Sequence, residues 1–135
     1  MSATFAAVFV ALYAAHQVAD HWVQTQHQAD HKDRAGWVGR WNCAKHVATY
    51  GATQLAALVL LAAVTGWRPA VLPLAVGMAV NLATHYIADR RTPLRRMADR
   101  LRKNPAWLEK GGGLYALDQS WHIGWLFVAA LIISA

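Results

Sequence analysis

The chain has 135 residues, the size of a single domain. Hydrophobic residues make up 56% of it and charged residues only 15%, against ~25% charged residues in ordinary soluble domains. A net charge of +6 could indicate nucleic-acid binding. The basic residues flank apolar runs, however, as they do beside membrane helices, so we expect no nucleic-acid partner. Cys43 is the single cysteine, which excludes a disulfide framework and a cysteine-based metal site.

Four apolar segments predict four transmembrane helices in one integral membrane domain covering residues 1–135. Each segment has ~20 residues, enough to cross a hydrocarbon core of ~30 Å. The spans are expected at about residues 4–26, 42–65, 69–89 and 114–134. A soluble four-helix bundle is the competing fold, but it needs polar faces that the second and fourth segments largely lack. The sequence therefore predicts an all-α transmembrane bundle.

The expected boundaries come from breaking and capping residues. The first segment begins without a basic n-region, so we expect no cleaved signal peptide. Gly36 and Gly39 are expected to interrupt the polar connector between the first two spans. Gly66 is placed to end the second span, and Pro69 to begin the third.

A basic stretch between the third and fourth spans predicts a short interfacial helix at about residues 93–103. Thr92 can cap this helix and Pro93 can open it. Leu94, Met97 and Leu101 would then share one face, with arginines opposite, which is the pattern of an amphipathic helix lying on a membrane surface. A solvated basic loop is the alternative.

The distribution of basic residues predicts the orientation. Of the 13 Lys and Arg residues, the first-to-second and third-to-fourth connectors with their flanks hold all but Arg68. The positive-inside rule then places these connectors in the cytoplasm and both termini outside. We expect a multi-pass protein of the bacterial cytoplasmic membrane.

Polar residues recur every four positions at one end of each apolar segment, so each set climbs a single helix face. The four sets are His16, Asp20 and Gln24; His46, Tyr50 and Gln54; Asn81, His85 and Asp89; and Asp118 with His122. The predicted topology places all four at one depth, in the cytoplasmic leaflet. Ionisable side chains inside a bilayer need partners, so we expect them to meet in a buried site.

Imidazole and carboxylate groups without thiolates suit a divalent metal, with zinc as the first choice and manganese or iron as alternatives. The expected ligands are Asp20, His85, Asp89, Asp118 and His122. His16 and His46 are the candidates for a general base. Hydrogen-bonding support is expected from Gln24, Tyr50, Gln54, Asn81 and Gln119. One ion or two could be held, and His–Asp pairing that only joins the helices is the structural alternative.

Other polar and aromatic residues are expected outside the site. His21, His27 and His31 are predicted to be exposed or interfacial, and Lys32 is predicted to be a solvated anchor that could contact an anionic head group. An interfacial aromatic belt is the expected role of Trp22, Trp37, Trp41, Trp107 and Trp121.

The order and spacing of these residues resemble a family of small bacterial and phage membrane proteins catalogued as domain of unknown function 3307. The pattern comprises His16-x3-Asp20-x3-Gln24-Thr25-x3-Ala29-x2-Lys32, His46, His85-x3-Asp89 and Asp118-Gln119-x2-His122. The resemblance covers nearly the whole chain, implies a multi-pass membrane protein and supplies no activity. Arg90 and Arg91 stand where the pattern would have a lysine. A looser similarity links the chain to small membrane-bound metal-dependent hydrolases with His/Asp ladders.

These observations predict a metal-dependent hydrolase embedded in the membrane and acting near the cytoplasmic leaflet, on a lipid or a lipid-linked phosphoester. A proton or ion relay, or a transporter, could use the same four sets of polar residues. A non-catalytic membrane module could instead bind a host membrane protein, and a phage could encode such a module. The expected partners are membrane lipids, with anionic head groups at the basic loop and a second copy or another membrane protein as further candidates.

Overall fold

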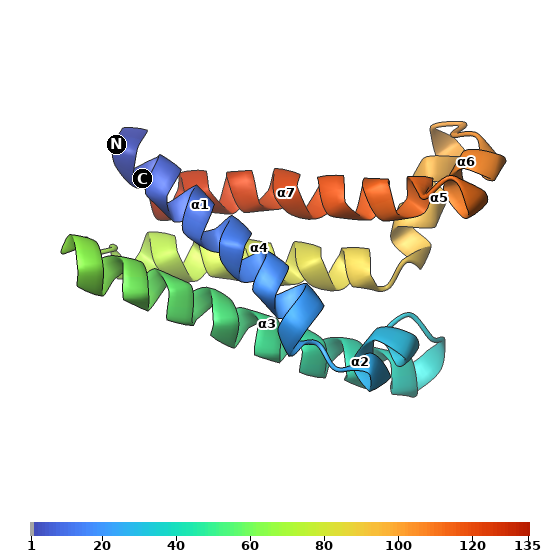
Figure 1. Cartoon of the computed structure of the whole chain (residues 1–135), viewed down its shortest axis with the longest axis horizontal. Helices are drawn as coiled ribbons and strands as arrows, with labels where there is room; N and C mark the ends of the chain where they lie inside the picture. The colour runs from blue at the N-terminus through green and yellow to red at the C-terminus, as the bar shows by residue number, and fades with distance from the viewer. Residues whose placement is uncertain (1) are drawn as a thin grey trace.

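The computed structural model describes residues 2–135 as a bundle of four long helices with three short helices at one end (Figure 1). Its elements are α1 (Ser2–Val18), the π-helix η1 (Ala19–Val23), α2 (Gln26–His31), α3 (Gly36–Thr65), α4 (Val71–Asp89), α5 (Thr92–Arg100), α6 (Pro105–Lys110) and α7 (Gly113–Ile133). Four helical stretches are long and apolar enough to cross a membrane: Ala3–Val23, Gly36–Thr65, Val71–Asp89 and Gly113–Ile133. The predicted all-α fold with four spans is confirmed.

The two ends of the bundle differ in composition. Both termini lie at one end, and α2, α5 and α6 lie at the other, so the two basic connectors are on the same side (Figure 1). The core near the termini is apolar and contains Val8, Leu12, Leu58, Met78, Leu126, Ala129, Ala130 and Ile133. Most of the buried polar residues lie between this apolar core and the connectors, and Gln28 and Lys32 lie in the first connector.

The first span departs from the expected continuous helix over residues 4–26. The α-helix ends at Val18, and a π-helical turn carries the chain to Val23. A new helix then starts at Gln26, because Thr25 and Gln28 form a capping box: the Thr25 hydroxyl accepts from the Gln28 amide at 3.2 Å, and the Gln28 side chain accepts from the Thr25 amide at 2.9 Å. Asp20 lies on the π-helical turn, a feature often found at functional sites.

The second span starts at Gly36 rather than at residue 42, so the expected break at Gly39 was wrong. Gly39 is buried inside the helix, where a side chain would collide with the carbonyl oxygen of Arg34 and lie 2.5 Å from the Arg90 guanidinium. The glycine therefore permits a close approach between the connector and the start of α3. Gly66 ends this helix with a left-handed conformation (φ 71°), as expected.

The third connector folds into two helices instead of one. The helix expected at 93–103 is present as α5 (Thr92–Arg100), with Leu94 and Ala98 buried and Leu101 exposed. Its position relative to a membrane surface remains a prediction. The second helix, α6, was not expected, although Asn104 followed by Pro105 is a helix-start signal: the Asn104 side chain accepts from the amides of Ala106 (2.8 Å) and Trp107 (3.3 Å).

Candidate metal centre

Histidine and aspartate side chains from all four spans meet at the connector end of the bundle. Asp20 comes from η1, His46 from α3, and His85 and Asp89 from α4. The three histidines His16, His46 and His85 are at most 1% exposed. These contacts agree with the expectation that the four sets of polar residues lie at one depth.

Four donor atoms in this cluster have the spacing of a tetrahedral metal site. The Nε2 atoms of His46 and His85 are 3.0 Å apart. Asp20 Oδ1 lies 3.3 Å from the first and 3.5 Å from the second, and Asp89 Oδ2 lies 3.2 Å and 3.3 Å from them. These five distances match five edges of a tetrahedron, and the sixth edge, between the two carboxylate oxygens, is not fixed by them. Edges of ~3.3 Å place the centre ~2.0 Å from every corner, which is the distance at which Zn²⁺ binds nitrogen and oxygen ligands.

The chemistry of these atoms also suits a cation. Asp20 Oδ1 and Asp89 Oδ2 are buried and have no hydrogen-bond partner within residues 2–135. Two Nε2 atoms facing each other at 3.0 Å require a proton or a cation between them. Buried carboxylate oxygens without donors are costly, and a shared metal ion satisfies all four atoms at once.

The imidazole rings of the two histidines are oriented by packing. The Tyr50 ring stacks on His85 with ring centroids 3.7 Å apart. The Nδ1 atoms of His46 and His85 have no hydrogen-bond partner in the part of the chain that the structure describes, which departs from the usual pattern of a carbonyl or carboxylate behind each ligating imidazole.

Lys32 belongs to the centre, and its prediction as a solvated anchor was wrong. Its ammonium lies 2.7 Å from Asp89 Oδ1, and both side chains are buried. The Arg90 guanidinium holds the connector in this position by donating to the backbone carbonyls of Lys32 and, at 2.7 Å, Arg34. The basic pair Arg90-Arg91 directly after Asp89 is visible in the sequence. The spacing of these residues does not indicate that Arg90 binds the first connector.

His122, Asp118 and His16 form a looser group beside the tetrahedron. His122 Nε2 lies 3.7 Å from Asp118 Oδ1 and 4.0 Å from Asp89 Oδ1. His16 Nδ1 lies 3.5 Å from Asp20 Oδ2, and its ring is 5.0 Å from that of His122. The distances therefore place His46, expected as a base, at a corner of the tetrahedron. Asp118 and His122, expected as ligands, form with Asp89 a second group whose donor atoms all lie within 4.8 Å of one another, and the His122 ring lies 4.3 Å from that of His85.

The residues expected to support the ligands divide into two groups. Tyr50 donates to Asn81 Oδ1 at 3.1 Å, and Gln54 donates to the Leu12 carbonyl at 3.1 Å, so these three polar side chains separate the centre from the apolar core. Gln24 is half-buried, and Gln119 donates only to the neighbouring Asp118, at 3.3 Å, among the bonds of the described residues. The other expected non-ligands, His21 and His27, are exposed, and His31 is half-buried.

The fixed charges around the centre favour one divalent ion over two. Asp20, Asp89 and Asp118 contribute three negative charges, and Lys32 contributes one positive charge, which leaves two negative charges with neutral imidazoles. One divalent cation balances this sum. A second one would leave two uncompensated positive charges in a buried region, which costs several kcal/mol.

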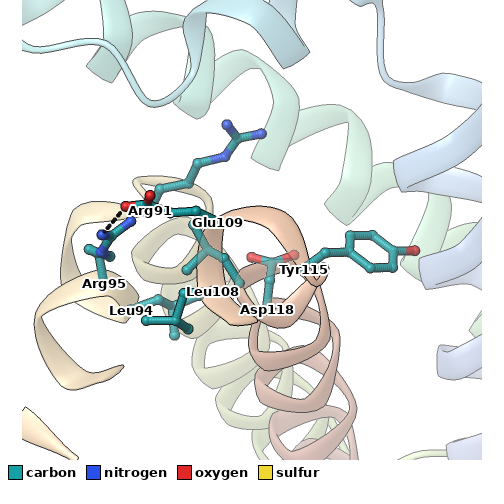
Figure 2. A pocket seen from close by; sticks show the side chains of 9 residues that line it. Arg91, Leu94, Arg95, Leu108, Glu109, Tyr115 and Asp118 are labelled. Carbon is teal, nitrogen blue, oxygen red and sulfur yellow. Dashed lines mark hydrogen bonds and ion pairs between the residues drawn. The ribbon is translucent and has the colours of Figure 1, made fainter. Parts of the chain in front are cut away.

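A cavity of about 400 Å³ lies at the connector end of the bundle, between α5, α6 and the start of α7 (Figure 2). Asp118 lines this cavity, and its side chain is 24% exposed. Arg95 and Glu109 pair at 2.8 Å on the wall, and the carboxylate raises the pKa of the guanidinium, which therefore stays charged. Asp118 therefore links the cavity to His122, whose Nε2 lies 3.7 Å away.

Comparison with known proteins gives one match. The family model described as "Protein of unknown function (DUF3307)" covers residues 8–135. No curated protein and no solved structure matches the chain.

Proposed function

The chain belongs to the DUF3307 family, and because the description of that family names no activity, we propose from the chemistry of the site that the protein is a metal-dependent hydrolase embedded in the membrane. It acts on a lipid or a lipid-linked phosphoester near the cytoplasmic leaflet. The ion is one divalent cation, zinc first, with manganese and iron as alternatives. The observation that carries the proposal is the buried group of Asp20, His46 and His85, whose donor atoms all lie within 4.8 Å of one another. Three protein ligands leave the fourth position of a tetrahedral ion to water.

Asp20, His46 and His85 would hold the cation, which when bound would supply the chemistry that the side chains lack: it would lower the pKa of a water molecule to ~7 and polarise a phosphoryl or acyl oxygen. For a phosphoester, water adds to phosphorus and the bond to the leaving alcohol breaks. One proton of the water would pass to His122, whose Nε2 lies 3.7 Å from Asp118 Oδ1, and then to the leaving oxygen. His16 is the second candidate for this proton transfer, since both of its ring nitrogens lack a partner within residues 2–135.

The location follows from charge. We infer a bacterial cytoplasmic membrane with the connector end in the cytoplasm and both termini outside, since every Lys and Arg except Arg68 lies in or beside the two connectors. The centre then lies just below the head groups of the cytoplasmic leaflet. A lipid is the substrate that reaches this depth without leaving the bilayer.

The apolar core near the termini favours an enzyme over a relay or a transporter. Between the polar centre and the opposite end, the packed residues are apolar, including Leu12, Leu58 and Leu126. A path for protons or ions needs polar groups or water along its length. A site open at one end only suits a reaction on a substrate that enters and leaves from the same side.

Metal content is the first test. Protein purified without added metal is expected to contain about one zinc per chain by elemental analysis. Asp20→Asn should lose the metal, whereas His21→Ala should retain it, because His21 is the exposed neighbour on the same turn. Turnover of a chromogenic phosphodiester in detergent should stop when a chelator removes the metal and resume when zinc is returned. A metal-free protein, or turnover that ignores the chelator, contradicts the proposal.

A non-catalytic membrane module is the second candidate. Four protein donors complete the coordination of a tetrahedral ion, and complete coordination is typical of structural zinc. In that case the ion joins η1, α3 and α4, and the module acts by binding another membrane protein. Stoichiometric zinc without turnover of any phosphodiester or lipid ester would favour this candidate over the hydrolase.

A further inference from the structure

The cavity between α5, α6 and α7 contains charged groups of both signs. Arg91 and Arg95 come from the α4–α5 junction and α5, Glu109 from α6, and Asp118 from α7 (Figure 2). We propose that this cavity binds the head group of a zwitterionic phospholipid that carries a primary ammonium, of the phosphoethanolamine kind. The proposal deepens the hydrolase proposal by naming its substrate class, and it rests on that function for its biological meaning.

The balance of charge selects the head group. Two guanidinium groups and two carboxylates line the same cavity, so its wall offers groups of both signs. A purely anionic head group would meet Glu109 and Asp118, and a purely cationic group would meet the two arginines. A zwitterion satisfies both sets, because guanidinium groups bind phosphate oxygens and carboxylates accept from the ammonium. A primary ammonium donates hydrogen bonds, whereas the quaternary ammonium of choline has none to donate.

The charged groups are free to exchange partners. Arg95 is 39% exposed and Glu109 57% exposed, and their 2.8 Å contact joins α5 to α6 at the cavity wall. Arg91 is 57% exposed and contacts Asp33 at 3.1 Å. Exposed ion pairs are weak because water screens them. A head group that carries both charges can therefore replace one such pair with two, its phosphate on a guanidinium group and its ammonium on a carboxylate.

The cavity leads to the metal centre through one shared residue. Asp118 lines the cavity and lies 3.7 Å from His122 Nε2, which in turn lies 4.0 Å from Asp89 Oδ1. Leu94, Leu108 and Leu114 supply the apolar part of the same wall. The volume of about 400 Å³ accommodates a head group without rearrangement of the helices.

Competition for lipid measures this preference directly. Delipidated protein receives an equimolar mixture of phosphatidylethanolamine, phosphatidylcholine and phosphatidylglycerol in detergent, and native mass spectrometry counts the lipids retained. Phosphatidylethanolamine is expected to exceed each of the others by about tenfold, the effect of one additional charge-assisted hydrogen bond. Equal retention, or an excess of phosphatidylglycerol, would overturn the proposal.

Substitutions separate the two charges. Arg95→Gln should reduce retention of both phosphatidylethanolamine and phosphatidylglycerol, whereas Glu109→Gln should reduce the former and increase the latter. Arg96→Gln is the matched control, because Arg96 is the exposed neighbour outside the cavity wall. A Glu109→Gln protein with the wild-type preference contradicts the proposal. Zinc content measured on the wild-type protein keeps the two proposals apart: a zinc-free wild type that still prefers phosphatidylethanolamine counts against the hydrolase alone, and a zinc-loaded wild type without that preference counts against the head-group site alone.

Discussion

Lys32 Nζ lies 2.7 Å from Asp89 Oδ1, although 57 residues separate the two in the chain and both side chains are buried. The contact joins the first connector to the end of α4, and the Arg90 guanidinium reinforces it by binding the carbonyls of Lys32 and Arg34. One oxygen of Asp89 thus binds the connector, while the other faces His46 and His85. The connector is therefore part of the site that it covers.

Replacing Lys32 with methionine tests this role. The substitution retains the unbranched stem and removes the charge, so Asp89 keeps a buried charge without its partner. We expect the free energy of unfolding to fall by ~3–5 kcal/mol, the usual effect of breaking a buried ion pair, as measured by thermal unfolding in detergent without metal. Lys45→Met is the control, because Lys45 is exposed. The double variant Lys32→Met with Asp89→Asn should recover part of the loss; equal stability of Lys32→Met and the wild type contradicts the prediction.

Zinc affinity distinguishes the corners of the tetrahedron from the neighbouring group. His46→Ala removes a corner atom and should weaken zinc binding by more than ~100-fold, whereas Asp118→Asn changes a residue beyond the ligands and should weaken it by ~10–100-fold. Competition with a chromogenic chelator measures both. A larger effect of Asp118→Asn would instead support the ligand set expected from the sequence, with Asp118 and His122 on the ion.

The sequence was sufficient for the helices and for the depth of the site, because both follow from local rules. Apolar length predicted the spans, and spacing by four predicted which residues share a face. Which of these groups lie in close contact did not follow from spacing, because His46 and His122 have the same kind of spacing, yet His46 Nε2 lies 3.2 Å and His122 Nε2 4.0 Å from a carboxylate oxygen of Asp89. Lys32 was missed for a related reason: its partner is set by the folded connector, which depends on Gly39 and Arg90 rather than on any local pattern.

Gly39→Ala tests whether close packing holds the connector in place. A methyl group at this position would collide with the Arg34 carbonyl and lie 2.5 Å from the Arg90 guanidinium. We expect a loss of ~1–3 kcal/mol in stability, typical of overpacking, together with faster tryptic cleavage at Arg34. Gly124→Ala is the control, because nothing lies within 4 Å of its new methyl group, and a helical glycine replaced by alanine gains ~0.5–1 kcal/mol. Similar behaviour of the two variants would refute the close-packing argument.

Tyr50 has two separable contacts, the stack on His85 and the hydrogen bond to Asn81. Tyr50→Phe retains the stack and leaves Asn81 Oδ1 without its donor, so it should lower stability by ~1 kcal/mol and leave zinc affinity nearly unchanged. Tyr50→Ala removes the ring against His85 as well, and should lower stability by ~3–5 kcal/mol and weaken zinc binding. Thermal unfolding and chelator competition measure the two effects. Equal zinc affinity in both variants would show that the stack does not orient the ligand.

The orientation of the bundle decides which lipids reach the centre. A periplasm-dependent phosphatase fused after Ala135 should be active, and the same reporter fused after Lys103 should be inactive, because the basic connectors are expected to remain in the cytoplasm. A fluorescent protein that folds only in the cytoplasm should give the opposite pattern at the two positions and serves as the control. The reverse result would place the metal centre and the head-group cavity in the outer leaflet. Lipid-linked substrates would then have to be presented from outside, and the arginines of α5 would meet a leaflet without the cytoplasmic excess of anionic lipid.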